Sequence, residues 1–106
     1  MTTVSKVSIK ESERTYEWSQ TDETIAIYLP IKNVLMKNIE IFCSDLLLKI
    51  TAQSIKYFVA IDFMHEIDHK SIKNKFQLVD QKLQVLLTKK VPGKSWQYLE
   101  VRGVTR

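Results

Sequence analysis

The feature that most limits the fold of this chain is the alternation of apolar and polar residues over short runs. In residues 24–29 (TIAIYL), Ile25, Ile27 and Leu29 fall on one side of an extended chain and Tyr28 falls on the other. A period of two residues is the side-chain spacing of a β-strand, and β-branched and aromatic residues favour that structure. The sequence therefore predicts strands over the following runs: 15–20, 24–29, 39–43, 46–51, 57–62, 71–78 and 82–89.

The segments between these runs are short and turn-like. Ser44 and Asp45 separate two of the runs, and residues 79–81 separate the last two, so both pairs are predicted to be hairpins. Pro30 ends the second run, where the missing backbone donor is tolerated. Many short strands joined by turns are typical of a β-sandwich or a β-barrel.

A length of 106 residues is enough for one domain with its own core. The polar residues 1–14, which carry charges of both signs, are expected to form a flexible N-terminal arm, and the folded domain is expected over residues 15–102. The lone Cys43, the absence of an apolar leader at the N-terminus and the absence of a long apolar run favour a cytoplasmic protein that does not enter a membrane. No motif for a cofactor is present, and the chain is expected to be a monomer.

The net charge of +4 raises the possibility of a nucleic-acid-binding β-barrel. The lysines are, however, scattered from Lys6 to Lys94, and only Lys89 and Lys90 are adjacent. Dispersed lysines are more typical of a solvated surface than of a track for phosphates. Lys82, Lys89 and Lys90 flank the last long hairpin, where they are either a solvated rim or a patch for an acidic partner.

Residues 65–69 (HEIDH) match the H-E-x-x-H signature of zinc metallopeptidases. In that alternative, His65 and His69 would bind zinc and Glu66 would be the general base, which requires a helix. Apolar periodicity fails after one turn, and the predicted strand 57–62 ends just before the motif. The favoured interpretation is a loop in which Ile67 enters the core while the charged and histidine side chains face water.

The order of several short motifs resembles the CS domain, the β-sandwich shared by small co-chaperones, CHORD and Sgt-type proteins and nuclear-distribution C proteins. The motifs are Tyr16-x-Trp18-x-Gln20, Leu29-Pro30, Leu46-x-Leu48-x-Ile50, Glu66-Ile67-Asp68, Leu83-x-Val85-x-Leu87 and Trp96-x-x-Leu99. The resemblance covers residues 15–102 and implies an all-β, seven-stranded antiparallel β-sandwich. We expect Trp18 in its core, with Trp96 and Leu99 holding the last strand onto the sandwich.

The resemblance implies a protein-interaction module rather than an enzyme, with partners among molecular chaperones of the heat shock protein 90 class or their clients. Ser19, Pro30 and Lys89 fall near positions that contact the chaperone in the Sgt-type branch, and Lys82 is a further candidate. That branch has aromatic residues where this chain has Ser19 and Pro30, and only Lys89 keeps its residue type.

Among CS domains, the chain is most similar to the N-terminal domain of the axonemal dynein assembly factor of the dyslexia-candidate type. The similarity lies in residues 29–32 (LPIK) and 41–43 (IFC). It implies a co-chaperone role in dynein assembly, and residues 103–106 are then a tail that continues into a longer protein.

Overall fold

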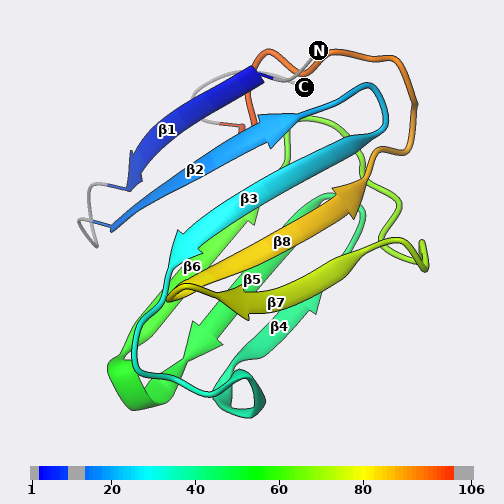
Figure 1. Ribbon diagram of the computed structural model, residues 1–106. Coiled ribbons are helices and arrows are strands. Elements are labelled where there is room, and N and C mark those ends of the chain that lie inside the picture. The colour runs from blue at the N-terminus through cyan, green and yellow to red at the C-terminus, as the bar shows by residue number, and fades with distance from the viewer. Residues whose placement is uncertain (1–2, 10–13, 102–106) are drawn as a thin grey trace.

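The computed structural model has two antiparallel β-sheets packed face to face (Figure 1). It describes residues 3–9 and 14–101. The five-stranded sheet has the order β1-β2-β3-β8-β7, and the three-stranded sheet has the order β4-β5-β6. The strands are β1 (Thr3–Ile9), β2 (Arg14–Gln20), β3 (Thr24–Pro30), β4 (Glu40–Cys43), β5 (Leu47–Ala52), β6 (Tyr57–Asp62), β7 (Lys75–Val79) and β8 (Lys82–Thr88), with short 3₁₀ turns η1 (Met36–Asn38) and η2 (Gln53–Ile55).

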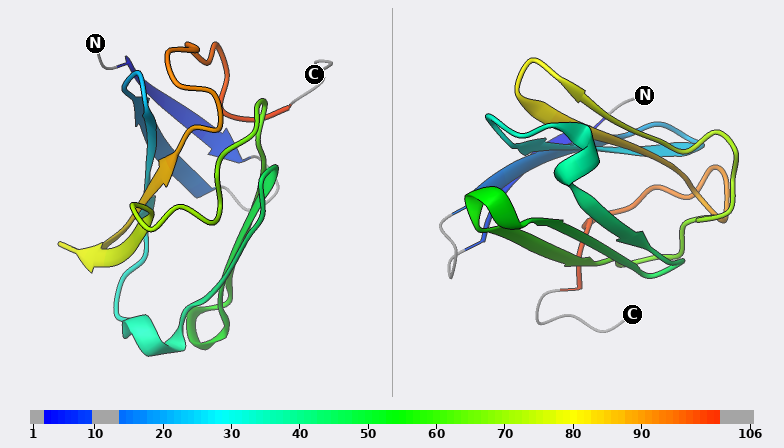
Figure 2. Two further views of the ribbon diagram at one scale, coloured as in Figure 1. Left: turned by 90° about the vertical axis from the view of Figure 1, so that its right-hand side faces the viewer. Right: turned by 90° about the horizontal axis from the view of Figure 1, so that it is seen from below.

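The predicted alternation holds in the central strands, where every second side chain is buried between the sheets. In β3, the side chains of Ile25, Ile27 and Leu29 are completely buried, and β6 and β8 follow the same pattern. Figure 2 shows the two layers edge-on, and the buried side chains fill the space between them. The predicted β-sandwich is therefore confirmed, and its seven expected strands correspond to β2–β8, four in one sheet and three in the other.

The N-terminal residues differ from the prediction of a flexible arm over 1–14. Thr3–Ile9 form β1, which pairs antiparallel with β2 from Thr3 opposite Gln20 to Ile9 opposite Arg14. This edge strand was missed because backbone hydrogen bonds to a neighbouring strand do not require the apolar alternation used to detect strands. Residues 1–2 and 10–13 of the expected arm, and the expected tail 103–106, lie outside the described residues.

Both predicted hairpins are present. Val79 and Lys82 are paired, so Asp80 and Gln81 form a two-residue turn, with φ angles of 51° and 62°. Positive φ at both central positions is what a type I′ turn requires, and that turn matches the twist of the flanking strands. β7 begins at Lys75 rather than at residue 71 because the preceding residues form turns, in which the Asn74 side chain bonds the Asp68 carbonyl and the Thr88 amide.

Two long connections close the sandwich. In the connection from β6 to β7, the Ile67 amide donates to the Asp45 carbonyl, and Ile67 also forms a bridge with Lys89. Near the C-terminus, the Met64 amide donates to the Leu99 carbonyl and the Val101 amide to the Asp62 carbonyl, so this segment continues the three-stranded sheet beyond β6. Within residues 3–9 and 14–101, no helix is long and apolar enough to cross a bilayer.

Candidate interaction surface

The outer face of the five-stranded sheet carries a polar and aromatic surface that we name the Tyr28 face. Tyr28 lies opposite Glu17 of β2 and Gln84 of β8, and Gln84 in turn lies opposite Gln77 of β7. These residues alternate with buried ones, so their side chains point away from the core. The Tyr28 face is defined by Glu17, Ser19, Ala26, Tyr28, Pro30, Gln77, Lys82, Gln84 and Leu86.

The centre of the Tyr28 face is slightly hollowed. A shallow depression of about 180 Å³ lies between Tyr28, Gln77 and Gln84 and extends to Ala26 and Leu86. The Lys82 Nζ atom lies 3.8 Å from a Glu17 carboxylate oxygen at the edge of this area. An exposed pair of this kind contributes little to stability, so a partner can compete for the Lys82 ammonium.

Three of the four predicted interaction residues lie on the Tyr28 face. Ser19, Pro30 and Lys82 come from β2, β3 and β8, and the antiparallel register brings them onto one surface. Sequence reasoning placed Tyr28 on the outward side of its strand but did not select it as a candidate, and it did not select Gln77, Gln84 or Leu86. These residues could have been found from the alternation in the sequence. In β3 and β8, the residues between the buried positions point outward and form this face.

Lys89 is different, and its prediction as a rim or contact residue is wrong. Lys89 is only 3% exposed, and it comes directly after the last residue of β8. The Lys89 Nζ donates to Gln20 Oε1 at 2.9 Å and to the Lys94 carbonyl at 2.6 Å. Lys89 therefore stabilises the inside of the domain instead of presenting a charge to a partner.

Gln20 completes this buried network with Trp96. The Gln20 Nε2 donates to the Trp96 carbonyl at 2.7 Å, and Gln20 Oε1 accepts from the Trp96 amide at 2.8 Å. Burial lowers the pKa of the Lys89 ammonium, and the nearby Asp22 carboxylate partly opposes this change. The charged form of Lys89 thus depends on the acceptors that Gln20 and Lys94 supply.

The residues that carried the family resemblance are structural. Trp18 and Tyr16 are each 2% exposed, and the Tyr16 hydroxyl donates to the Glu100 carboxylate. The Trp96 ring packs edge-on against Phe63, with ring centroids 6.0 Å apart, and Leu99 is also buried. Trp18 lies in the core as expected, and Trp96 and Leu99 are buried too, but the segment around them forms one isolated bridge, Phe63 with Glu100, instead of the expected last strand.

The HEIDH segment does not form the helix that a zinc peptidase site requires. Residues 63–69 run as bends and isolated bridges, with Ile67 fully buried as predicted. The two imidazoles have different neighbours: the His65 ring lies 5.5 Å from the Trp96 ring, and His69 Nδ1 lies 2.5 Å from an Asp45 carboxylate oxygen. His65 is also less exposed than expected.

The electrostatics around His65 disfavour a divalent cation. Burial lowers the pKa of His65, and the positive charges of Lys94 and Lys89 lower it further. The same ammonium groups would repel a metal ion at this imidazole. Within the described part of the chain, no group of three or more His, Cys, Asp and Glu side chains is arranged to hold a metal ion.

Cys43 is expected to react slowly with thiol reagents. It is half-buried on β4, and burial together with the Asp45 charge raises its pKa to about 11. Because the thiolate is the reactive species, Cys43 at neutral pH should react with iodoacetamide far more slowly than free cysteine does. Mass spectrometry of the folded and the urea-unfolded chain measures this difference, and equal rates would contradict it.

Known proteins share the fold. The nuclear movement protein from E. cuniculi GB-M1 superposes with a TM-score of 0.67 at 23% identity, over 81% of this chain and 98% of that protein. The CS-b5R domains of human Ncb5or give a TM-score of 0.66 at 22% identity, over 81% of this chain and 25% of that one. The CS1 domain of USP19 gives 0.52 at 20% identity, over 80% and 92% of the two chains.

Sequence comparison points to the same family. No curated protein matches the chain significantly. The sequence model of the SHQ1-like CS domain matches residues 14–103, which is most of the chain and includes the expected domain over 15–102. The chain therefore belongs to the SHQ1-like CS domain family.

Proposed function

We propose that this CS domain is a non-catalytic adaptor that binds a chaperone of the heat shock protein 90 class through the Tyr28 face. The CS fold is a chaperone-associated protein-interaction fold, and the family match assigns the chain to it. The observation that carries the proposal is the Tyr28 face itself, an outward sheet surface with an aromatic residue beside a shallow hollow. Aromatic side chains are over-represented among the residues that dominate binding energy.

The chemistry of the Tyr28 face fits binding rather than catalysis. Its polar groups are amides, the Ser19 and Tyr28 hydroxyls and one solvent-exposed lysine–glutamate pair, and all of them can form hydrogen bonds or ion pairs with a partner. Gln77 Nε2 donates to Gln84 Oε1 at 3.3 Å, and the second N–H of Gln77 and the amide nitrogen of Gln84 can still donate to a partner. A rim charge such as Lys82 steers an acidic partner and affects its rate of association.

The finer part of the proposal is a role in the assembly of axonemal dyneins in the cytoplasm. Its support is the resemblance of residues 29–32 and 41–43 to the dynein assembly factor of the dyslexia-candidate type. In the structure, the first of these segments ends β3 beside the Tyr28 face, and the second lies in β4 of the other sheet. The adaptor would bring the chaperone to dynein clients without changing either covalently.

Isothermal titration of the chain with purified heat shock protein 90 tests the Tyr28 face. Tyr28→Ser should weaken binding about tenfold or more, because it removes the aromatic contact from the middle of the surface. The matched control is Phe58→Ser on the outer face of the three-stranded sheet, where Phe58 is 51% exposed. It should leave the affinity unchanged, and circular dichroism should show that both variants are folded.

Lys82→Glu adds a second measurement on the same face. It should slow association with an acidic chaperone surface, and the difference from the unmodified chain should shrink at high salt. Equal affinities for the chain, Tyr28→Ser and Phe58→Ser would exclude the Tyr28 face as the binding surface. A chain that gives no heat with the chaperone at about 1 mM would exclude direct binding.

A further inference from the structure

The two sheets leave one side of the sandwich open, between the edge strands β7 and β4. Each of these strands lies at the end of its sheet, and Figures 1 and 2 place them on the same side of the molecule. At the other edge of the three-stranded sheet, the Val101 amide donates to the Asp62 carbonyl, so the C-terminal segment covers the end of β6. Among the described residues, no strand pairs with the outer edge of β7 or of β4.

Apolar side chains that pack only partly against the core gather along this open side. They come from β7, from β4 and from the connector between β3 and β4, and all are half-buried: Val34, Met36, Ile41, Cys43, Phe76 and Leu78. In the neighbouring strand β8, the inward side chains are almost completely buried. The core is therefore incompletely covered along β7.

The backbone of β7 directs hydrogen-bonding groups to the same side. Val79 and Lys82 flank a two-residue turn and so exchange hydrogen bonds, and bonded pairs alternate with non-bonded pairs along the hairpin. Phe76 and Leu78 lie at non-bonded positions, so their N–H and C=O groups point away from β8. Within the described part of the chain, no hydrogen bond uses these groups. Two residues of a strand span about 7 Å, which is the spacing at which a further antiparallel strand forms its bonds.

A hydrogen bond on the other side of β8 supports this assignment. The Ile31 amide donates to the Gln81 carbonyl at 3.3 Å, so the backbone groups of Gln81 face β3. Those of the next residue, Lys82, face β7, because successive residues of a strand direct these groups to opposite sides. Val79, which is paired with Lys82, is therefore bonded to β8, and Leu78 is not.

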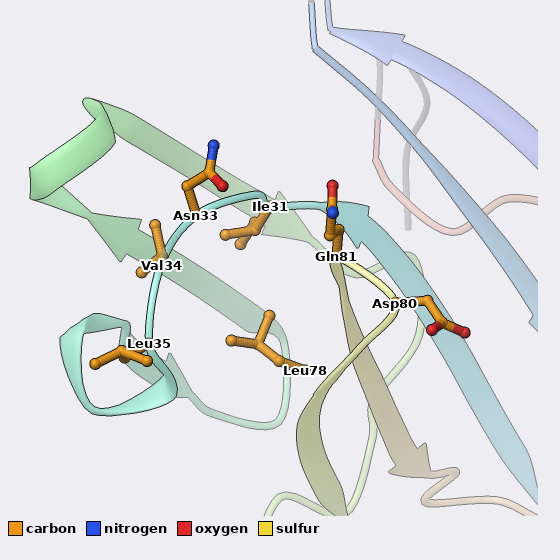
Figure 3. A pocket seen from close by; sticks show the side chains of 7 residues that line it. All are labelled: Ile31, Asn33, Val34, Leu35, Leu78, Asp80 and Gln81. Carbon is orange, nitrogen blue, oxygen red and sulfur yellow. The ribbon is translucent and has the colours of Figure 1, made fainter.

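The turn end of β7 is hollowed. A groove of about 310 Å³ lies between this end and the β3–β4 connector, and Figure 3 shows Leu78 on one side of it and Val34 and Leu35 on the other. Leu35 is 62% exposed. Ile31, at the base of the groove, directly follows Pro30, so the groove adjoins the Tyr28 face. An apolar side chain of a strand lying along β7 can enter this groove.

β7 lacks several features that usually prevent a strand from adding to an edge. Proteins protect exposed edges with proline, bulges, very short strands or charged residues that point inward. β7 contains no proline, pairs with β8 over five residues without a bulge, and points Phe76 and Leu78 inward. β4 is shorter, with four residues. Of the two open edges, β7 is therefore the better site for strand addition.

We propose that β7 binds an extended segment of a partner protein as an additional antiparallel strand. The backbone groups of Phe76 and Leu78 pair with the segment, which alternates apolar and polar residues. Its apolar side chains cover Phe76 and Leu78, and the one beside the β7–β8 turn enters the groove. The added strand lies next to Gln77 and so widens the Tyr28 face. This contact goes beyond the chaperone contact, because it depends on backbone pairing at the edge of the sheet.

Two isomeric, fluorescein-labelled peptides of alternating valine and threonine test the backbone pairing. One carries N-methyl groups on its threonine amides, and the other carries them on its valine amides. Directly opposite residues of an antiparallel pair point to the same face, so the valines point inward and their amides face β7. Anisotropy should therefore show binding of the threonine-methylated peptide and none of the other. Equal binding of the two isomers would contradict the proposed pairing.

Hydrogen exchange of the backbone amides, followed by NMR, locates the added strand. In the free chain, the amides of Phe76 and Leu78 should exchange much faster than those of Gln77 and Val79, which are bonded to β8. The threonine-methylated peptide should slow the exchange of Phe76 and Leu78. Slowed exchange over residues 41–43 of β4 instead would overturn the proposal. So would slowed exchange without peptide that increases with the concentration of the chain, as expected for a second copy on the same edge.

Phe76→Lys places a charge under the added strand and should weaken binding of the threonine-methylated peptide about tenfold or more. The matched control is Phe58→Lys, the same change on the outer face of the other sheet, where Phe58 is 51% exposed. It should bind like the unmodified chain, and circular dichroism should show that both variants are folded. No change in anisotropy with the unmodified chain at about 1 mM would also overturn the proposal.

Discussion

Gln20→Ala will destabilise the domain by about 3 kcal/mol, because a buried ammonium group loses an acceptor and two backbone groups lose their hydrogen-bond partner. The substitution takes away the acceptor of the Lys89 ammonium and both hydrogen bonds to the Trp96 backbone. Lys89 would keep only the Lys94 carbonyl. Urea denaturation followed by tryptophan fluorescence measures the change in the free energy of unfolding.

The control for Gln20→Ala is Gln77→Ala, the same chemical change at an exposed position of β7. Its effect should stay within about 0.5 kcal/mol. Gln20→Ala combined with Lys89→Met should be less destabilised than the sum of the single changes, because no ammonium is left without its acceptor. Equal losses for Gln20→Ala and Gln77→Ala would mean that the network contributes nothing to stability.

Ile67→Ala is the second change with a large expected effect, a loss of about 2–5 kcal/mol. Ile67 is fully buried, its amide bonds the Asp45 carbonyl, and truncation leaves a cavity between the β6–β7 connection and the core. Ile72→Ala, five residues further along the same connection but 98% exposed, should change stability by less than about 0.5 kcal/mol. Thermal unfolding of the two variants in parallel measures this contrast.

Glu66→Gln separates the structural interpretation of HEIDH from the catalytic one. Glu66 is exposed, so the substitution should leave the melting temperature unchanged. In a zinc peptidase, Glu66→Gln would remove the general base and abolish cleavage. Ile67→Ala would reduce the activity less, because Ile67 has no chemical role in that mechanism. A chain that cleaves casein and loses this activity through Glu66→Gln would contradict the structural interpretation.

The sequence predicted the sandwich well because its core strands alternate strictly. Ile25, Ile27 and Leu29 were assigned to one face from their spacing alone, and the structure buries all three. β1 escaped this method, since Thr3–Ile9 is an edge strand defined by its pairing with β2. Alternation reports burial, whereas an edge strand can form without it.

The candidate site was only partly predictable, for two physical reasons. Ser19, Pro30 and Lys82 come from three strands, and only the register shows that they share a face with Tyr28. Lys89 was misassigned because a lysine is assumed to be exposed. Its main side-chain partner, Gln20, lies 69 positions earlier in the sequence, so the residues around Lys89 give no local signal of its burial.

The bond between Gln20 and Trp96 also bears on when the domain can fold. These residues are 76 positions apart, and Lys89 lies 69 positions from Gln20. Contacts between such distant positions slow folding, because a long loop must close before they contribute. During synthesis, β2 and β3 leave the ribosome long before Trp96 does. We therefore expect the sandwich to close only after translation has passed Trp96, which leaves the Trp18 side of the core open to chaperones until then.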